Sequence, residues 1–254
     1  MKKIYYLLTM LSIICFSTSC GSDDEDELNN TTVVIKDDGT SSNGSRFVGI
    51  DDQNFYLDYI KYTVEEGHLI VSGYDKVGFS GNAKIVAGIT YKGNSYEVLG
   101  IKNYAFYKCS RLTSLTIPSS VTSIGESAFE GCYGLTSLTI PSSVTSFGDF
   151  AFRSCSGLTS LTIYSIVIGY CAFEYCNGLT SLTISSSVTS IGAYAFSGCS
   201  GLTSIHCLWT TPPRIDYKTF NEIYEKSTLY VPKGSLEAYK STYPWRNFHN
   251  IVEE

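Results

Sequence analysis

The sequence predicts an α/β-type solenoid that is mainly β, with turns of about 23 residues and one parallel strand in each turn. An Ala-Phe pair recurs along the 254 residues at intervals of 23, 23, 21 and 23, and a leucine follows each pair at a constant spacing. Such self-similarity indicates a stack in which each turn buries its apolar side only against its neighbours. The pairs begin at Ala105, Ala128, Ala151, Ala172 and Ala195, and the leucines are Leu112, Leu135, Leu158, Leu179 and Leu202.

The first part of each copy has the pattern of a β-strand. Leu115 and Ile117 alternate with Ser114 and Thr116, which is the period of a strand with one buried face. Strands of successive copies are then expected to pair in parallel, about 4.8 Å apart. This leucine pattern, at a period within roughly 20 to 29 residues, is typical of a leucine-rich repeat. The two inward columns are Leu115, Leu138, Leu161, Leu182 and Ile205, and Ile117, Ile140, Ile163, Ile184 and Cys207.

The repeat unit LxxLxLPxxVxxIGxxAFxxCxxL resembles the BspA-like class of bacterial surface leucine-rich repeats, over residues 89–208. Residues 230–251 are similar to the closing segment that such proteins often carry. Family members are typically cell-surface proteins, and several are adhesins or antigens that bind other proteins. The resemblance therefore implies a non-catalytic, adhesin-like module whose partner is an extracellular or host protein.

Residues 1–19 have the layout of an export signal peptide. Lys2 and Lys3 precede an apolar run over residues 4–16, and small residues follow it. The run is shorter than the about 20 residues that span a bilayer, which disfavours a membrane anchor helix. Cys20 then stands where bacterial lipoproteins carry their lipidated cysteine, and residues 21–25 resemble the signal that sends lipoproteins of the Bacteroidetes lineage to the cell exterior.

These resemblances imply a lipid anchor at Cys20 in the outer membrane, facing the cell exterior, as the only contact with a membrane. Residues 20–45 are acidic at first and then rich in Ser, Thr, Asp, Asn and Gly, so we expect a flexible tether there. Much of the net charge of −6 belongs to the acidic run, and residues 28–254 carry only about −3. A body this close to neutral has no basic field for a phosphate backbone, which argues against nucleic acid as a partner.

The two ends of a solenoid need covering, because open sheet edges recruit other chains. Residues 46–88 read as short strands that form an N-terminal β cap. Residues 209–254 are expected to form a C-terminal cap, with a short helix that Ser235 begins and that runs to about Lys240. The aromatic cluster after it is favoured as a lid over a ligand site, because a terminal repeat requires a cap. The cluster comprises Tyr243, Trp245, Phe248 and Ile251.

The cysteines and histidines do not form a recognisable reactive site in the sequence. Five cysteines share one repeat position, and neighbours lie within reach of a disulfide, but a ladder of reduced, buried thiols is favoured. Cys171 departs from this position and is the thiol most expected at the surface. No CxxC, GxSxG, HExxH or P-loop pattern occurs, so we expect no metal, no cofactor and no catalytic residue. The five cysteines are Cys109, Cys132, Cys155, Cys176 and Cys199.

The outward strand positions form a ladder of small hydroxyls, which is the predicted recognition surface. Residues that break the ladder serve no purpose in the repeat and are therefore the best binding candidates. The third turn is also two residues short, and we expect this either to alter the local curvature or bulge the far wall, or to be neutral. A glycan-binding lipoprotein for nutrient capture is the alternative function, because the chain holds 20 tyrosines. The candidate binding residues are Tyr164, His206 and Leu208, with Ser160, Thr162, Ser181 and Thr183 beside them.

Overall fold

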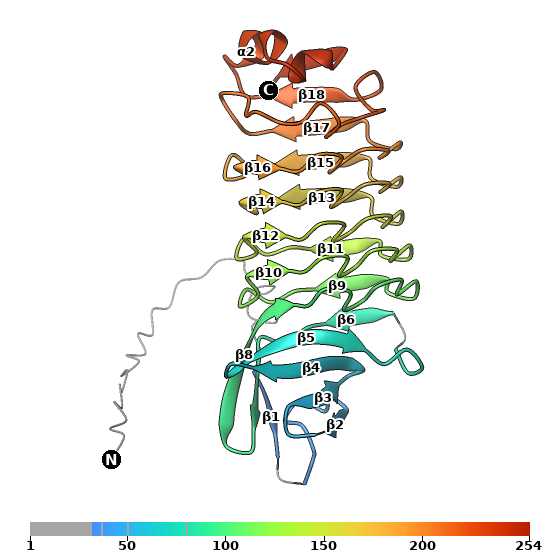
Figure 1. Ribbon diagram of the computed structural model, residues 1–254, viewed down its shortest axis with the longest axis vertical. Helices are drawn as coiled ribbons and strands as arrows, with labels where there is room; N and C mark the ends of the chain where they lie inside the picture. The colour runs from blue at the N-terminus through green and yellow to red at the C-terminus, as the bar shows by residue number, and fades with distance from the viewer. Residues whose placement is uncertain (1–31, 37, 50, 80) are drawn as a thin grey trace, which may run out of the picture.

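The computed structural model describes residues 32–36, 38–49, 51–79 and 81–254. The molecule is an elongated stack of turns, with β-strands of the N-terminal cap at one end and helix α2 (Leu236–Ser241) at the other (Figure 1). The expected signal peptide, Cys20 and the acidic run lie outside the described residues. Among the described residues, no helix combines the length and the apolar character needed to cross a bilayer.

The described residues form the following strands, in chain order. They are β1 (Thr32–Ile35), β2 (Phe47–Gly49), β3 (Asn54–Leu57), β4 (Ile60–Glu65), β5 (His68–Tyr74), β6 (Asn82–Lys84), β7 (Gly88–Tyr91), β8 (Asn94–Ile101), β9 (Ser114–Thr116), β10 (Ser123–Ile124), β11 (Ser137–Thr139), β12 (Ser146–Phe147), β13 (Ser160–Ile163), β14 (Val167–Ile168), β15 (Ser181–Ile184), β16 (Ser190–Ile191), β17 (Ser204–Cys207), β18 (Thr228–Val231) and β19 (Asn250–Glu253). A 3₁₀ helix, η1 (Trp245–Asn247), follows α2.

The predicted solenoid is confirmed, and each regular turn adds a second, shorter parallel strand to the one expected. The longer strands are β9, β11, β13, β15 and β17, and the shorter ones are β10, β12, β14 and β16 (Figure 1). The short strand forms because outward Ser123 and inward Ile124 pair in register with Ser146 and Phe147 of the next turn. The repeat thus alternates polar and apolar residues twice per turn, and sequence analysis recognised only the first alternation.

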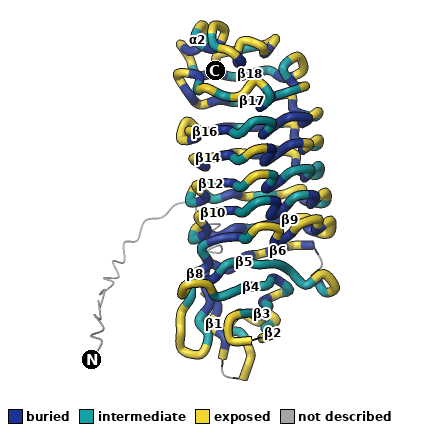
Figure 2. Tube along the Cα trace, viewed as in Figure 1, coloured by how far each residue is buried: buried dark blue, intermediate teal, exposed yellow. Residues whose placement is uncertain are grey.

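The core is a column of stacked side chains along the solenoid. Figure 2 shows that buried residues recur in every turn. The phenylalanines of the Ala-Phe pairs stack face to face, and Phe152 lies 5.0 Å from Phe129 and 5.2 Å from Phe173 between ring centroids. Phe220 continues this stack at 5.5 Å from Phe196, in a sixth copy whose alanine is replaced by Thr219. Each turn therefore buries its aromatic ring only against the turns on either side, as a solenoid requires.

The expected ladder of reduced cysteines is present, with all seven described cysteines free and buried. Four of the thiols lie within hydrogen-bonding distance of a backbone carbonyl of an earlier turn, such as Cys155 Sγ, which donates to Phe129 O at 3.2 Å. The expectation for Cys171 was wrong, because only 3% of this residue is exposed. Its thiol lies under the wall of the turn, and burial raises its pKa to about 11.

The N-terminal cap is continuous with the solenoid. Strands β2 to β5 form an antiparallel meander, and β5 pairs in parallel with β8, which pairs in turn with β10. Strand β1 lies inside the segment expected to be a flexible tether, and Val33 and Ile35 are buried there. It pairs with β7 because its alternating apolar residues match the inner face of the β7–β8 hairpin. The ordered cap therefore extends beyond the expected residues 46–88 on both sides.

The C-terminal cap extends the long-strand sheet by two strands, β18 and β19. Trp245 and Phe248 are buried with their ring centroids 5.7 and 5.5 Å from that of Phe220, which confirms them as a lid. Tyr243, expected in the same lid, is 54% exposed. Ser235 occupies the N-cap position of α2 but its side chain makes no capping hydrogen bond. Instead, Glu253 Oε1 accepts a backbone N–H from the residue on either side of Ser235.

Candidate binding surface

The predicted hydroxyl residues lie side by side on two neighbouring strands. Ser160 and Thr162 on β13 stand in register with Ser181 and Thr183 on β15. All four side chains face solvent, whereas the alternating Leu and Ile residues between them are buried. The outward positions of β11, β13 and β15 contain no charged residue. This part of the strand face is therefore a neutral surface of small hydroxyls.

His206 is at the C-terminal end of this surface and already has partners within the chain. Its ring stacks on that of Tyr230, with centroids 4.5 Å apart and planes 6° from parallel. Its Nδ1 lies 2.8 Å from Glu254 Oε1. Sequence analysis missed Tyr230, although Thr228–Val231 shows the same polar and apolar alternation as the repeat strands. The structure thus makes His206 part of the contact between the solenoid and its last strand.

Tyr164 and Leu208 are free at the surface, and each is close to half exposed. Both occupy the position that follows the inward Ile or Cys of a long strand, where Pro118 and Pro141 stand in earlier turns. They are not neighbours, since Tyr164 follows β13, Leu208 follows β17, and β15 lies between these two strands. The three candidates that break the ladder therefore lie in two turns, Tyr164 in one and His206 with Leu208 in the other, rather than at one point.

The long-strand sheet is interrupted between β11 and β13. Strand β11 pairs with β9, and β13 pairs with β15, but within the described residues no backbone hydrogen bond joins residues 136–141 to residues 159–164. On either side of this interruption, the backbone hydrogen bonds between the same two layers of chain are present. Ala151 O accepts the Phe129 N–H at 2.8 Å on one side, and Thr145 O accepts the Val167 N–H at 3.0 Å on the other. The opening is therefore local to the strand face, and Figure 1 shows it as the wider gap between the arrows of β11 and β13.

The shortening of the third turn explains this interruption. Two residues are absent between Ile163 and Ile168, so the inward valine that other turns place there, such as Val144, has no counterpart. Ser165 is buried in this turn and donates to Val144 O at 2.6 Å. A turn with less chain cannot hold its strand in register with the turn before it. Leu138 is consequently only partly buried, unlike the other members of its column.

The short turn also replaces polar positions by large apolar residues. Ile166 stands where other turns have Thr122, Thr145 and Thr189, and Val167 stands where they have serine. Ile166 is 45% exposed and Val167 is 39% exposed. With Tyr164 they form what we call the third-turn patch, beside the interruption in the sheet. Sequence analysis missed Ile166 and Val167, although a comparison of their columns across the copies would have found them.

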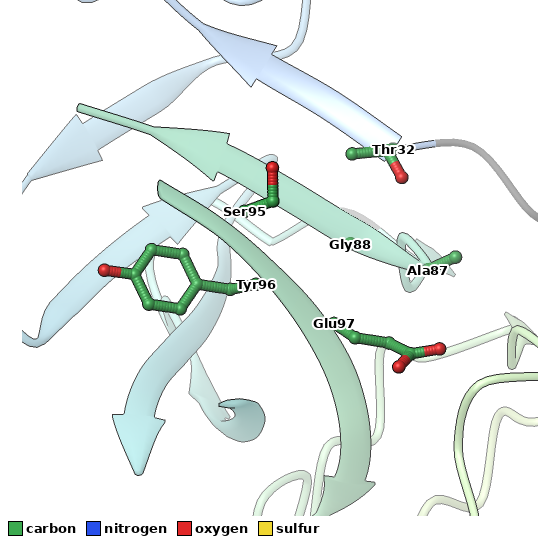
Figure 3. Close-up of a pocket in the computed structure, with 6 residues that line it drawn as sticks. All are labelled: Thr32, Ala87, Gly88, Ser95, Tyr96 and Glu97. Atoms are coloured by element: carbon green, nitrogen blue, oxygen red, sulfur yellow. The ribbon is translucent and has the colours of Figure 1, made fainter. Parts of the chain in front are cut away.

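The described residues do not assemble a metal site or a catalytic site. No group of three or more metal-ligating side chains occurs among them. His68 on β5 and His206 on β17 lie in different parts of the stack, and within the described residues His206 Nδ1 contacts the carboxylate of Glu254. A hollow of about 390 Å³ between β1, β7 and β8 has one ionisable carboxylate, that of Glu97, in its lining (Figure 3). The hollow lacks the nucleophile and base pair that hydrolysis would need.

These features define a repeat solenoid with a neutral, hydroxyl-rich strand face, a class of fold that generally binds rather than catalyses. Six copies of the BspA-type leucine-rich repeat region match the chain, over residues 99–225 and 166–251. The chain belongs to this family.

Solved structures show the same fold. A leucine-rich repeat protein from Bacteroides ovatus is 31% identical, with 72% of this chain and 55% of that chain covered and a TM-score of 0.55. A leucine-rich repeat protein from T. pallidum is 27% identical, with 58% and 68% covered and a TM-score of 0.52. The pneumococcal vaccine antigen PcpA, 21% identical with 78% and 48% covered and a TM-score of 0.59, is similar in fold alone. Among curated proteins, none matches this chain.

Proposed function

We propose that this protein is a cell-surface lipoprotein whose solenoid binds an extracellular or host protein without catalysis. The observation that carries the proposal is the third-turn patch beside the interrupted sheet. In the first, second and fourth turns the corresponding positions are proline, serine or threonine, which keep the surface soluble. Exposed Tyr164, Ile166 and Val167 do nothing for the repeat, and exposed apolar residues of this kind mark sites where proteins interact.

The chemistry of this surface favours a protein partner. Strand edges without partners offer backbone N–H and C=O groups that an extended polypeptide matches by strand addition. The neutral hydroxyl ladder on β13 and β15 imposes no charge on the partner. Recognition then depends on shape, on backbone hydrogen bonds and on a few apolar contacts. A partner of this kind would bind across the strand face, with its apolar anchor at the third-turn patch.

The location follows from the sequence. Export by residues 1–19, lipidation at Cys20 and an acidic segment beside it support an anchor in the outer membrane with the solenoid facing the exterior. Multiple acyl chains give firm anchoring, at about 0.8 kcal/mol for each buried CH₂ group. Protease shaving of intact cells tests this orientation, because a solenoid facing the periplasm would survive the treatment.

Binding is tested with the double variant Ile166→Thr and Val167→Ser, which restores the residues of the other turns. The full chain is presented to a panel of purified extracellular matrix proteins by surface plasmon resonance. We expect the variant to lose about tenfold or more of the affinity of any partner found, because hot spots at interfaces are few and apolar. Val77→Ser is the matched control, since Val77 is an 88% exposed valine on the N-terminal cap. Equal losses from both variants would contradict the assignment.

Glycan capture on the strand face is the second candidate, suggested by the hydroxyl ladder and by exposed Tyr164. A glycan array probed in parallel with the protein panel separates the two. A strong sugar signal that Tyr164→Ala abolishes, with no protein retained, would replace the proposed function.

A further inference from the structure

Two adjoining hollows lie where the N-terminal cap meets the first turn, and they share Tyr74 and Lys76. Their volumes are about 170 and 330 Å³. We call them together the cap-junction pocket. None of its lining residues belongs to the strand face or to the third-turn patch. The first hollow is also lined by Phe79, Lys108, Cys109, Ser110 and Arg111, and the second by Ser72, Gly73, Tyr104, Ala105 and Tyr107.

The cap-junction pocket collects three cations without counter-ions. Lys76, Lys108 and Arg111 are exposed, and none has a carboxylate within 4.0 Å in the part of the chain that the structure describes. No Asp or Glu lines either hollow. The nearest acidic neighbour in sequence, Asp75, accepts the backbone N–H of Val77 within its own turn at 2.9 Å. In a protein with a net charge of −6, this is a local concentration of positive charge.

Arg111 is also a departure from the repeat. The later turns have glycine at this position, because a Cβ on Gly134 would lie 2.5 Å from Ser110 O and one on Gly157 would lie 2.7 Å from Tyr133 O. The first turn follows the cap rather than another turn, so a side chain fits there. Lys108 likewise stands where later turns have Gly, Ser or Tyr. Arg111 and Lys108 thus occupy positions at which the later turns have no charged residue.

Tyrosine rings border these cations. Tyr104 is 52% exposed and Tyr107 is 37% exposed, and their rings meet nearly at right angles, 5.7 Å apart. Tyr104 donates its hydroxyl hydrogen to Glu126 at 2.7 Å, which holds its ring in place. Lys108 Nζ lies 5.0 Å from the centre of the Tyr107 ring. The pocket therefore presents exposed aromatic rings and positive charges together.

Tyr74 forms the shared wall of the two hollows. Its ring stacks on Phe106 with centroids 5.6 Å apart and planes 7° from parallel, so the wall is tied to the aromatic column of the core. Burial raises the pKa of Tyr74 to about 12, and its hydroxyl stays neutral at physiological pH. The serine hydroxyls of Ser72 and Ser110 add further neutral donors and acceptors around the pocket.

We propose that the cap-junction pocket binds an acidic saccharide. A carboxylate or sulfate group contacts Lys108 and Arg111 through charge-assisted hydrogen bonds, and the sugar ring packs on an exposed tyrosine. The hollows have the size of one or two sugar residues rather than of a protein surface. The unpaired strand edges and the apolar patch that favour a polypeptide elsewhere are not part of this pocket. The inference goes beyond the proposed protein binding and uses a separate set of residues.

The test measures binding of the full chain in detergent to defined oligosaccharides by isothermal titration calorimetry. The probes are oligogalacturonate for carboxylates, chondroitin sulfate oligosaccharides for sulfates, a neutral galactan and an oligoglutamate peptide. We expect one or both acidic saccharides to bind, the neutral galactan and the peptide not to bind, and the affinity to fall with added salt. Failure of both acidic saccharides, or equal binding of the neutral galactan or the peptide, would overturn the proposal.

The variants Arg111→Gly and Lys108→Ser place repeat residues in the pocket and should preserve the fold, which thermal melting checks. Each is expected to weaken saccharide binding about tenfold, the typical effect of losing a hydrogen bond to a charged group. Lys233→Ser, which removes an exposed lysine from the C-terminal cap, is the matched control. The double variant Ile166→Thr and Val167→Ser should leave saccharide binding unchanged. Unaltered binding in the pocket variants would show that the saccharide binds elsewhere.

Discussion

The imidazole ring of His206 lies parallel to the phenol ring of Tyr230, with their centroids 4.5 Å apart. This stack joins the last long strand of the repeats, β17, to the first strand of the C-terminal cap, β18. Glu254 then reaches back across β18 to the Nδ1 of His206. The contacts of His206 with Tyr230 and Glu254 thus hold the last strands to the repeats on the outward face of the sheet, in addition to the aromatic lid in the core.

Removing this outer contact should loosen the last strand without unfolding the solenoid. Glu254→Ala is expected to cost at most about 1 kcal/mol of unfolding free energy, because the pair is solvent-exposed. Amides of β19 should exchange with deuterium faster, whereas those of β15 should not change. Glu237→Ala, at an exposed carboxylate of α2, is the control. Faster exchange throughout the solenoid would contradict this local role.

The aromatic column should contribute most of the stability of each turn. Phe152→Ala removes a fully buried ring that stacks on both neighbours, and we expect a loss of about 3 to 5 kcal/mol in urea unfolding. Phe150→Ala, at a partly exposed ring in the same turn, should cost much less. Similar losses for the two variants would mean that the column does not dominate the packing.

The cysteine ladder should be chemically silent in the folded protein. Burial raises the pKa of the ladder thiols Cys155 and Cys176 well above the ordinary value, and that of neighbouring Cys171 to about 11, so little reactive thiolate exists at pH 8. We expect Ellman's reagent to label the described cysteines only after denaturation. The folded state holds the proton of the Cys171 thiol more tightly than the unfolded state does. The stability that comes from this difference is complete below the ordinary thiol pKa and is lost as the pH rises through about 11. Rapid labelling of the native protein at pH 8 would refute this.

Lipidation is expected to depend on Cys20 alone. Cys20→Ala should move the protein from the membrane fraction to the soluble fraction after export. Cys15→Ala, inside the apolar run of the leader, is the matched control and should leave the protein at the membrane. Membrane association of the Cys20 variant would contradict a lipid anchor at this residue.

Restoring the length of the third turn should close the interrupted sheet. Replacing Tyr164 to Val167 by the segment Pro-Ser-Ser-Val-Thr-Ser of the preceding turn gives the regular spacing. We expect about 1 to 3 kcal/mol of added stability, from the burial of Leu138 and from new hydrogen bonds between β11 and β13. Urea unfolding measures this gain. A loss of stability would show that the short turn is not the cause of the interruption.

The sequence predicted the solenoid well because its columns repeat. The inward positions of Leu115 and Ile117 and the Ala-Phe wall follow directly from periodicity. The burial of a side chain at a contact between two unequal turns could not be predicted from periodicity. The exposure of Leu138 comes from two residues missing in the following turn, and the burial of Cys171 comes from packing under the wall.

The candidate site was predicted only in part. Tyr164 and Leu208 were found because they break the hydroxyl ladder. His206 breaks it too, but its partners Tyr230 and Glu254 come from a cap in which the repeat is weaker. The three cations of the cap-junction pocket come from two different segments, and only the fold brings them together.

The interrupted sheet also has a mechanical consequence. The strands lie across the long axis of the stack (Figure 1), so a pull along this axis would separate turns one after another instead of sliding strands past each other. Between the turns of β9 and β11, and between those of β13 and β15, two ladders of backbone bonds and the Ala-Phe wall resist separation, whereas the junction between β11 and β13 lacks one ladder. Under load, the stretch of turns from β9 to β16 should therefore part first at that junction, into an N-terminal block and a C-terminal block.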